Sequence, residues 1–387
     1  MDFELSDEQR ALHDSLTRLL SDRHDAETRR RIAASPAGWS EPLWRQLVDL
    51  GLAALPVAAA QGGLGGRTED LMVAMRAVGR SLAAVPLLGS VAMPAAALQA
   101  AGGDAAGRWL PALAAGDALL AWAHDEPAGD GGADWVTLRA RHDGQCWRLD
   151  GCKSAVHHGD SADRLLVSAR LQGDDGDADG RALFLLAPDA SGLQRRSLRL
   201  IDGTPACELA LQGVPAEPVA VDGDAASRAI DAALAVGMAG CCAELLGAME
   251  SALALTVDYL RTRRQFGRLI GDNQALRHAL ADMQVSLEMA HSMSLLAALQ
   301  ADAPDAPLSR ADLHRARLVV DRHARLLAEA AIQLHGGIGM TEEYAVGHVL
   351  RRVLVLETVC GDADLHVAEI DRSAPWNNSP ARISSSV

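Results

Sequence analysis

The change of residue texture along the chain is the feature that most constrains its fold. Apolar residues recur at helical spacing up to about residue 120, short strand-like runs separated by Asp-Gly turns follow, and long helical stretches return from about residue 225. Alanine and leucine dominate, and only 3% of the residues are aromatic, a composition that favours packed helices over sheets. The order predicts a mostly helical α+β fold in which helices precede and follow a small β domain.

Local signals place the individual elements. Ser6 followed by Gln9 has the form of a capping box and predicts a helix to about Leu20. Helical periodicity predicts further helices over 44–50, 69–82, 225–262, 274–302, 308–334 and 342–358, with an Ala-rich run that ends near residue 120. Strand-like runs cover 135–138, 165–168 and 182–186, and the Gly- and Asp-rich stretch 173–180 is predicted to be a mobile hairpin loop.

These elements predict three domains and a tail. An N-terminal helical domain covers residues 1–119, a middle antiparallel β domain covers 120–222, and a C-terminal four-helix bundle covers 223–372. The tail, residues 373–387, is rich in Ser, Pro and Asn and is predicted to be disordered.

Charge, cysteines and the N-terminus narrow the class of protein. A net charge of −15 argues against nucleic acid or an anionic membrane surface as a partner, because both require a basic face. The first residues lack the basic and apolar regions of a secretory signal, and we expect no apolar run long enough to cross a bilayer. The six cysteines show no C-x-x-C pair and no clustering with histidine, so we expect neither a disulfide framework nor a metal site. These features predict a cytoplasmic protein.

Three motifs occur in an order that points to one family. Residues 259–274 read YLRTRRQFGRLIGDNQ, residues 333–339 read QLHGGIG, and residues 150–153 read DGCK, with Ala-Asp at 162–163. They resemble the R-x-x-F-G…Q motif, the Q-x-x-G-G-x-G motif and the middle-domain strands of the acyl-CoA dehydrogenase family. The resemblance covers about residues 3–371, and in detail the chain is similar to the small-subunit type of pimeloyl-CoA dehydrogenase.

The resemblance implies a flavoprotein oxidoreductase that binds FAD and converts an acyl-CoA into the trans-2-enoyl-CoA, as in fatty acid metabolism. A base removes the α-proton while the β-hydride passes to the flavin, and the electrons then leave to an electron-transfer flavoprotein. The resemblance also implies a tetramer, either of identical chains or of two homologous subunits. A dicarboxylic or other bulky acyl group is suggested, but the sequence does not distinguish it from a fatty acyl chain or a steroid side chain.

Six positions match residues that bind the dinucleotide part of FAD in this family: Arg263, Phe266, Gln274, Gln333, Gly336 and Gly337. A pyrophosphate needs positive charge, which Arg263 offers, and close backbone N–H groups, which bare glycines allow. In the family, these groups reach across to FAD on a neighbouring subunit. Taken singly, Arg263 also fits a solvated helix end and the glycines fit an ordinary helix stop. The combination favours a dinucleotide clamp.

The usual catalytic base of the family is missing. Cys360 stands where the family has a Glu, and a thiol with an ordinary pKa of about 8.5 is a poor replacement for a carboxylate. The alternative base position, on the helix before the Arg-rich motif, is Gly237. Glu244 lies seven residues further along an apolar helix, so burial would make it a candidate base. The competing interpretation is an ion pair between Glu244 and an arginine across the subunit interface. Glu357 is a weaker candidate and is expected to be a surface carboxylate.

The positions that surround the flavin ring also depart from the family. The family's T-E-P-x-x-G-S-D segment begins as D-E-P at residues 125–127, the aromatic residue beside the ring is replaced by Ala155, and a nearby hydroxyl residue is replaced by His157. Met238 takes the place of an Arg that contacts CoA in some relatives. The residues that match the dinucleotide clamp are therefore retained, whereas the residues that would surround the flavin ring, the ring cradle, are replaced.

This asymmetry favours one function and leaves two others open. The favoured hypothesis is a subunit of a heteromeric acyl-CoA dehydrogenase, in which this chain contributes the FAD clamp and a homologous partner contributes the ring cradle and the usual Glu. The first alternative is a complete homotetrameric enzyme that uses Glu244 as its base. The second alternative is a non-catalytic scaffold of the same fold.

Overall fold

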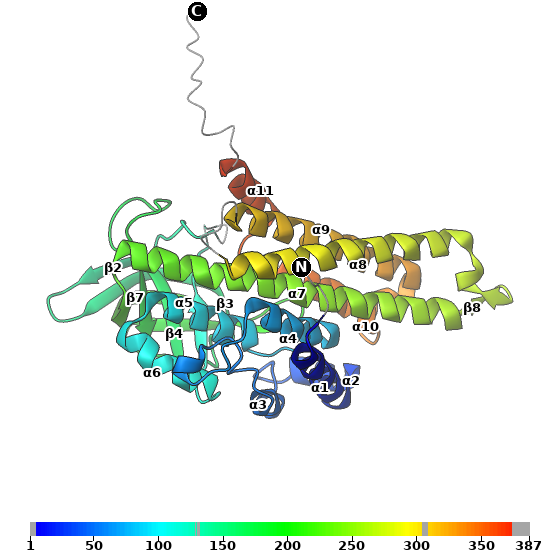
Figure 1. Cartoon of the computed structure of the whole chain (residues 1–387), viewed down its shortest axis with the longest axis horizontal. Helices are drawn as coiled ribbons and strands as arrows, with labels where there is room; N and C mark the ends of the chain where they lie inside the picture. Colours follow the sequence, from blue (N-terminus) through cyan, green and yellow to red (C-terminus); the bar gives the residue numbers. More distant parts are fainter. Residues whose placement is uncertain (1–4, 128, 130–131, 304–308, 374–387) are drawn as a thin grey trace, which may run out of the picture.

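Figure 1 shows the fold in a computed structural model, which describes residues 5–127, 129, 132–303 and 309–373. The longest helix, α7 (Gly223–Thr262), has 40 residues and runs through the length of the molecule. In Figure 1, the N-terminal helices and the sheet lie below α7, with the sheet toward the left, and two long helices lie above it. The predicted order of helices, sheet and helices is confirmed. The exact division into domains stays a prediction.

The N-terminal part contains α1 (Asp7–Arg23), α2 (Ala26–Ala33), α3 (Glu41–Asp49), α4 (Thr68–Ser81), α5 (Met93–Ala101) and α6 (Gly103–Ala114). The capping box of α1 is confirmed, because Ser6 and Gln9 exchange hydrogen bonds of 3.1 and 3.0 Å. Sequence patterns missed α2, because this Arg-rich helix has no buried residue and so no apolar face. The Ala-rich run forms two helices, since Gly102 and Gly103 both take positive φ between them.

The middle of the chain forms a sheet from β1 (Leu120–Ala123), β2 (Arg139–His142), β3 (Trp147–His157), β4 (Arg164–Arg170), β5 (Arg181–Leu186), β6 (Leu193–Arg199) and β7 (Pro205–Ala220). The strand order is β1-β4-β2-β3-β7-β5, and β6 also pairs with β7. Because β5 pairs with both β7 and β4, the sheet closes around its own apolar core. Most pairs are antiparallel, as predicted, but β4 is parallel to β1 and β2.

The strand predicted over 135–138 is wrong. The segment is extended but belongs to no strand, because a side chain takes the backbone groups that a neighbouring strand would need. The N–H groups of Thr137 and Leu138 donate to the carboxylate of Glu126 at 2.8 and 3.1 Å. The apolar pattern came from burial of Leu138, not from a strand ladder.

The C-terminal part contains α8 (Gln274–Ala301), α9 (Ser309–His335), α10 (Ala345–Leu356) and α11 (Ala363–Arg372). Together with α7, the first three form the predicted bundle. Helix α11 was not predicted, because polar residues interrupt its short apolar face. The predicted disordered tail lies outside the described residues from position 374 onward.

Helix α7 corrects one expectation from the sequence. By length and composition alone it could cross a membrane, although no such run was expected. In this fold, however, 83% of its most apolar 18-residue window is buried. That burial accounts for the apolar composition without a bilayer, because a core helix surrounded on all sides is apolar all round.

Two glycines let α4 and α7 cross with their backbones in contact. A Cβ atom on Gly79 would overlap the carbonyl of Glu244, and one on Gly247 would overlap the carbonyl of Arg76. Any larger residue at either position would push the helices apart. The crossing therefore fixes the position of Glu244 along α7 relative to α4.

Candidate functional site

The first predicted clamp motif forms the end of α7 and a two-residue hairpin. Arg263 follows the last helical residue, and the strands β8 (Arg264–Gln265) and β9 (Arg268–Leu269) pair directly after it. Phe266 and Gly267 form the turn with φ of 49° and 79°, the left-handed pair of a tight hairpin. A bulky residue in this region costs about 1–2 kcal/mol. Nevertheless, Phe266 contributes no burial, because its side chain is fully exposed.

The second motif lies where α9 ends. Gln333 is exposed in the last turn of the helix, and Gly336 takes φ of 66° just beyond it. A Cβ atom on Gly336 or Gly337 would meet nothing within 4 Å, so the backbone of this turn is bare on its outer side. Bare backbone N–H groups at such a turn can approach an anion closely.

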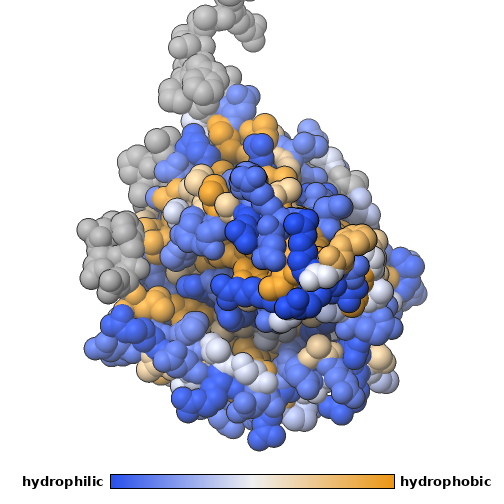
Figure 2. Space-filling model, turned by 90° about the vertical axis from the view of Figure 1, so that its right-hand side faces the viewer, coloured by the Kyte–Doolittle hydropathy of each residue, from blue (hydrophilic) through white to orange (hydrophobic). Residues whose placement is uncertain are grey.

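Three aromatic rings join the two motifs. The Tyr259 ring of α7 stacks on His335 of α9 with 4.5 Å between centroids, and Tyr344 lies 4.9 Å from His335 and 6.1 Å from Tyr259. Segments more than seventy residues apart in sequence therefore meet at one end of the molecule, on the right in Figure 1. Figure 2 faces this end and shows hydrophilic side chains around exposed hydrophobic patches.

Three arginines at this end form no ion pair with any residue that the structure describes. They are Arg261, Arg263 and Arg264, and all three are exposed. Gln274 is exposed at the first position of α8. A solvated helix end would be equally exposed, so exposure alone does not decide the role of these residues. Their gathering beside bare glycine backbone is what a pyrophosphate site requires. The clamp role of the six residues stays a prediction.

The positions expected around the flavin ring meet in the interior, far from the clamp motifs of the same chain. Ala155, His157, Glu244 and Cys360 all line one cavity between the sheet, α4, α5 and α10. Its volume is only about 60 Å³, room for a few water molecules at roughly 10–15 Å³ each. That volume is too small for a flavin ring, although a larger pocket of about 330 Å³ lies beside it and shares Leu234 and Cys360 with it.

Glu244 is an ion-pair residue in this fold. Its carboxylate accepts a hydrogen bond from Nε of Arg352 on α10 at 2.6 Å, and Nη1 of Arg352 donates to Asp202 at 2.8 Å. Although burial disfavours its charge, Arg352 has a raised pKa because of the two carboxylates. The expected alternative for Glu244, an ion pair with an arginine, therefore holds. However, the arginine belongs to the same chain rather than to a neighbouring subunit, which corrects the predicted partner.

Neither family position for a catalytic base offers a carboxylate. Cys360 is buried, and burial raises the pKa of its thiol well above the ordinary value, so it stays protonated. At the second position, a Cβ atom on Gly237 would lie 2.6 Å from the Cys360 sulfur and 2.8 Å from Cε of Met93. An acidic side chain there would require Cys360 or Met93 to move. The weaker candidate, Glu357, is bound to Arg325 of α9 at 2.9 Å.

Two histidines complete the closed cavity. Burial, helped by the charge of Arg352, lowers the pKa of His157 to about 4. Burial and the neighbouring His157 lower the pKa of His158 to about 3. Both rings are therefore neutral near pH 7. Sequence reasoning missed Arg352 and Asp202, and the one available signal was the Arg-Arg pair at 351–352 in an otherwise apolar helix.

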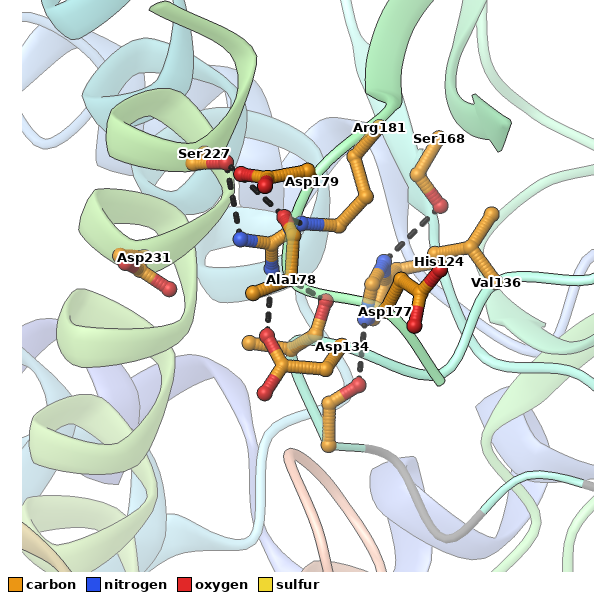
Figure 3. Close-up of polar contacts among 12 residues, drawn as sticks. His124, Asp134, Val136, Ser168, Asp177, Ala178, Asp179, Arg181, Ser227 and Asp231 are labelled. Atoms are coloured by element: carbon orange, nitrogen blue, oxygen red, sulfur yellow. Dashed lines mark hydrogen bonds and ion pairs between the residues drawn. The ribbon is translucent and has the colours of Figure 1, made fainter. Parts of the chain in front are cut away.

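The sheet is fastened to α7 by a buried arginine, shown in Figure 3. Arg181 donates to the Ser227 hydroxyl of α7 at 2.8 Å and to the Ala133 carbonyl at 2.7 Å, and its guanidinium lies 3.0 Å from Asp134. Nearby, the His124 ring lies between the Ser168 hydroxyl and the Gly132 carbonyl at 2.9 and 3.0 Å. The contacts of Arg181 hold the sheet against α7. Among the described residues, no group of His, Cys, Asp or Glu could hold a metal ion.

Comparison with known proteins identifies the class. Models described as the N-terminal and C-terminal domains of acyl-CoA dehydrogenase match residues 6–117 and 227–374. The acyl-CoA dehydrogenase IpdE2 of Mycobacterium tuberculosis is 32% identical over 339 residues, covering 87% of this chain and 88% of the relative.

Solved structures give the same result for the fold. The ChsE4-ChsE5 complex from Mycobacterium tuberculosis matches with a TM-score of 0.86 at 26% identity, covering 98% of this chain and 100% of that one. A variant of the Tcur3481-Tcur3483 steroid ACAD matches with a TM-score of 0.84 at 28% identity, covering 95% and 97%. The fold and the matched domains define a flavoprotein-type oxidoreductase. The chain belongs to the acyl-CoA dehydrogenase family.

Proposed function

We propose that this chain is one subunit of a heteromeric, FAD-dependent acyl-CoA dehydrogenase. It would contribute the dinucleotide clamp, and a homologous partner would contribute the ring cradle and the catalytic Glu. The observation that carries the proposal is the contrast between an open, cationic clamp at the surface and a closed cavity of about 60 Å³ at the chain's own ring position. Two of the similar structures are named as pairs of differently named chains, which supports a heteromer.

The fit of FAD differs between the two places. The clamp motifs suit the dinucleotide, because the exposed Arg263 guanidinium forms no ion pair with the described residues and Gly336 leaves backbone bare. The interior cavity does not suit the ring, because it is small and the paired side chains of Glu244 and Arg352 line it. A flavin held by this chain would therefore place its ring in another subunit.

The residues of this chain would bind and orient FAD, and they would not take part in the proton transfer. Arg263 and its neighbours would neutralise the pyrophosphate, the backbone at Gly336 and Gly337 would donate hydrogen bonds, and Phe266 would offer its ring face. FAD supplies the hydride acceptor when it is bound. The α-proton of the acyl-CoA would go to the partner's base, and the electrons would leave to an electron-transfer flavoprotein. We also assign the complex to the cytoplasm.

The experiment is co-expression of this chain with a homologous subunit, followed by measurement of bound FAD. Arg263→Gln should lower FAD retention at least tenfold, because one charge-assisted contact contributes about 1.5–3 kcal/mol. Arg322→Gln, an exposed position of α9 without an ion pair in the described chain, is the matched control and should retain FAD. Full flavin loading and activity of the chain alone would contradict the heteromer and favour the homotetramer. No flavin in any assembly would favour the scaffold.

A further inference from the structure

A second pocket, separate from the clamp residues and the closed interior cavity, opens among the N-terminal helices. It has a volume of about 430 Å³ and lies between α1, α2, α4 and α7. In Figure 1, α1 and α2 are the dark-blue helices below the right half of α7. None of the six clamp residues lines this pocket, although Asp258 and Ala345 on its rim adjoin two of the aromatic rings between the clamp motifs.

Three polar groups on the pocket wall are buried without hydrogen-bond partners. They are the hydroxyl of Thr17, both ring nitrogens of His24 and Nη2 of Arg29. His24 is only 6% exposed. The Leu82 carbonyl lies near its ring but completes no hydrogen bond of normal geometry. An unpaired buried polar group costs about 1–3 kcal/mol, so three such groups on one wall need an explanation.

Arg29 is the strongest of the three observations. Its guanidinium forms no ion pair or hydrogen bond with any residue that the structure describes. Burial, with repulsion from Arg30 and Arg351, lowers its pKa to about 10. Asp202 and Glu342 attract it only from a distance, since Asp202 is bound to Arg352 and Glu342 to Arg351. A partly buried cation on the pocket wall therefore lacks a counter-ion among the described residues.

The acids around the pocket do not supply one in this fold. Asp25 caps α2, because one of its carboxylate oxygens accepts from the Thr28 N–H at 2.8 Å. Asp258 lies on the rim and forms no ion pair with Arg29. Behind the wall, a second cavity of about 20 Å³ also touches His24 and Arg29, and it has room for only one or two waters.

We propose that this pocket binds a small-molecule oxyanion, a phosphate or a carboxylate, through Arg29, His24 and Thr17. All three side chains can donate hydrogen bonds, and an oxyanion is an acceptor on every side, which matches their chemistry. A guanidinium is especially suited to the paired oxygens of these groups. The positive charge of Arg29 on the wall disfavours a metal cation. The site is independent of the FAD clamp and goes beyond the proposed function.

The test is titration of the full chain, alone or in the complex that it forms, with sodium phosphate and separately with sodium acetate. Binding is measured by calorimetry and by thermal shift against sodium chloride of equal ionic strength. We expect saturable binding of at least one anion, with its dissociation constant raised at least tenfold by Arg29→Gln. Tighter binding of phosphate indicates that the natural ligand carries a phosphate group, and tighter binding of acetate indicates a carboxylate.

Two further variants keep the test decisive if Arg29→Gln does not fold. Thr17→Val removes only the hydroxyl and should weaken binding several-fold, whereas Arg18→Gln, an exposed neighbour outside the pocket, should change nothing. FAD retention should be unaffected by all three changes, which separates this site from the clamp. Absence of saturable binding would overturn the proposal. So would a crystal structure with Arg29 paired to Asp258 or to water alone in the presence of both anions.

Discussion

At the scale of single residues, the interior positions that the sequence suggests for a base are buried or bound within the chain. The position of the family's base holds a buried thiol, and the backbone of Cys360 takes φ of 62°, a conformation that side chains rarely adopt. The one interior carboxylate on α7 with a position suited to a base, Glu244, is bound to Arg352. Arg352 also binds Asp202, so one guanidinium pairs with two carboxylates from different parts of the fold.

Glu244→Gln separates a structural role from a catalytic one. The change removes one charge-assisted hydrogen bond of Arg352, which contributes about 1.5–3 kcal/mol, while Asp202 still pairs with the guanidinium. We expect a loss of this order in the free energy of unfolding, measured by denaturant titration. Glu342→Gln, in an exposed pair with Arg351, should cost less than about 1 kcal/mol.

The rate of turnover tests whether Glu244 also has a catalytic role. A co-expressed complex that carries Glu244→Gln should keep its kcat when it is assayed below its unfolding temperature. If turnover disappears while the complex stays folded and loaded with flavin, Glu244 is the base and the homotetramer is the better account.

At the scale of elements, buried cations fix segments that the sequence presents as loops. Arg170, fully buried at the end of β4, donates to the carbonyls of Val136, Asp175 and Asp179 at 2.7–2.9 Å, and to two further carbonyls of the same region. The loop over 173–180, predicted to be mobile, therefore wraps its backbone around a guanidinium. Acidic loops with this spacing often enclose Ca²⁺, and here an arginine takes the central position.

Arg170→Met should release this loop. Five backbone carbonyls would lose their donor at once, so we expect the 173–180 segment to become the first site of proteolytic cleavage, and unfolding free energy to fall by about 3 kcal/mol or more. Arg139→Gln removes an exposed contact to the same loop and serves as control. Limited proteolysis with mass analysis makes the measurement, and equal resistance of both variants would contradict the anchoring role.

The contact between α9 and α11 should make stability sensitive to acid. His314 and His366 share a buried contact of 2.9 Å between their Nδ1 atoms. Burial, with nearby arginines, lowers the pKa of His314 to about 4 and that of His366 to about 2. Because the folded state disfavours protonation, the unfolded chain binds more protons below its own pKa of about 6.5. Stability is therefore full above that pH and falls as the pH drops toward 4.

Each such histidine should lower the free energy of unfolding by up to about 2 kcal/mol when the pH falls from 7 to 5. His366→Gln keeps hydrogen-bonding capacity but cannot take up the proton, so its loss over this interval should be smaller than that of the wild type by about that amount. Unfolding by urea at the two pH values provides the comparison. If the variant and the wild type lose the same free energy of unfolding between the two pH values, His366 is protonated in the folded protein as readily as in the unfolded one.

At the scale of the whole molecule, the predicted dinucleotide clamp lies exposed at one end, and a small cavity lies in the interior. Local motifs were sufficient to predict the α-β-α order, which the structure confirms, because it depends on neighbours in sequence; the clamp residues and the absence of a base stay predictions. The Glu244–Arg352 pair joins positions 108 residues apart, and the carboxylate of Glu126 that displaces a strand acts through a buried side chain. Such long-range partners leave no periodic signal, so their effects could not be predicted.

The flavin stoichiometry of the assembled protein tests the central claim most directly. The chain is purified alone and together with a homologous subunit, and FAD is quantified per chain by absorbance and native mass spectrometry. The account predicts no retained FAD in the isolated chain and one FAD for each pair of unlike chains in the complex. One FAD bound per copy of this chain in the absence of any partner would contradict it.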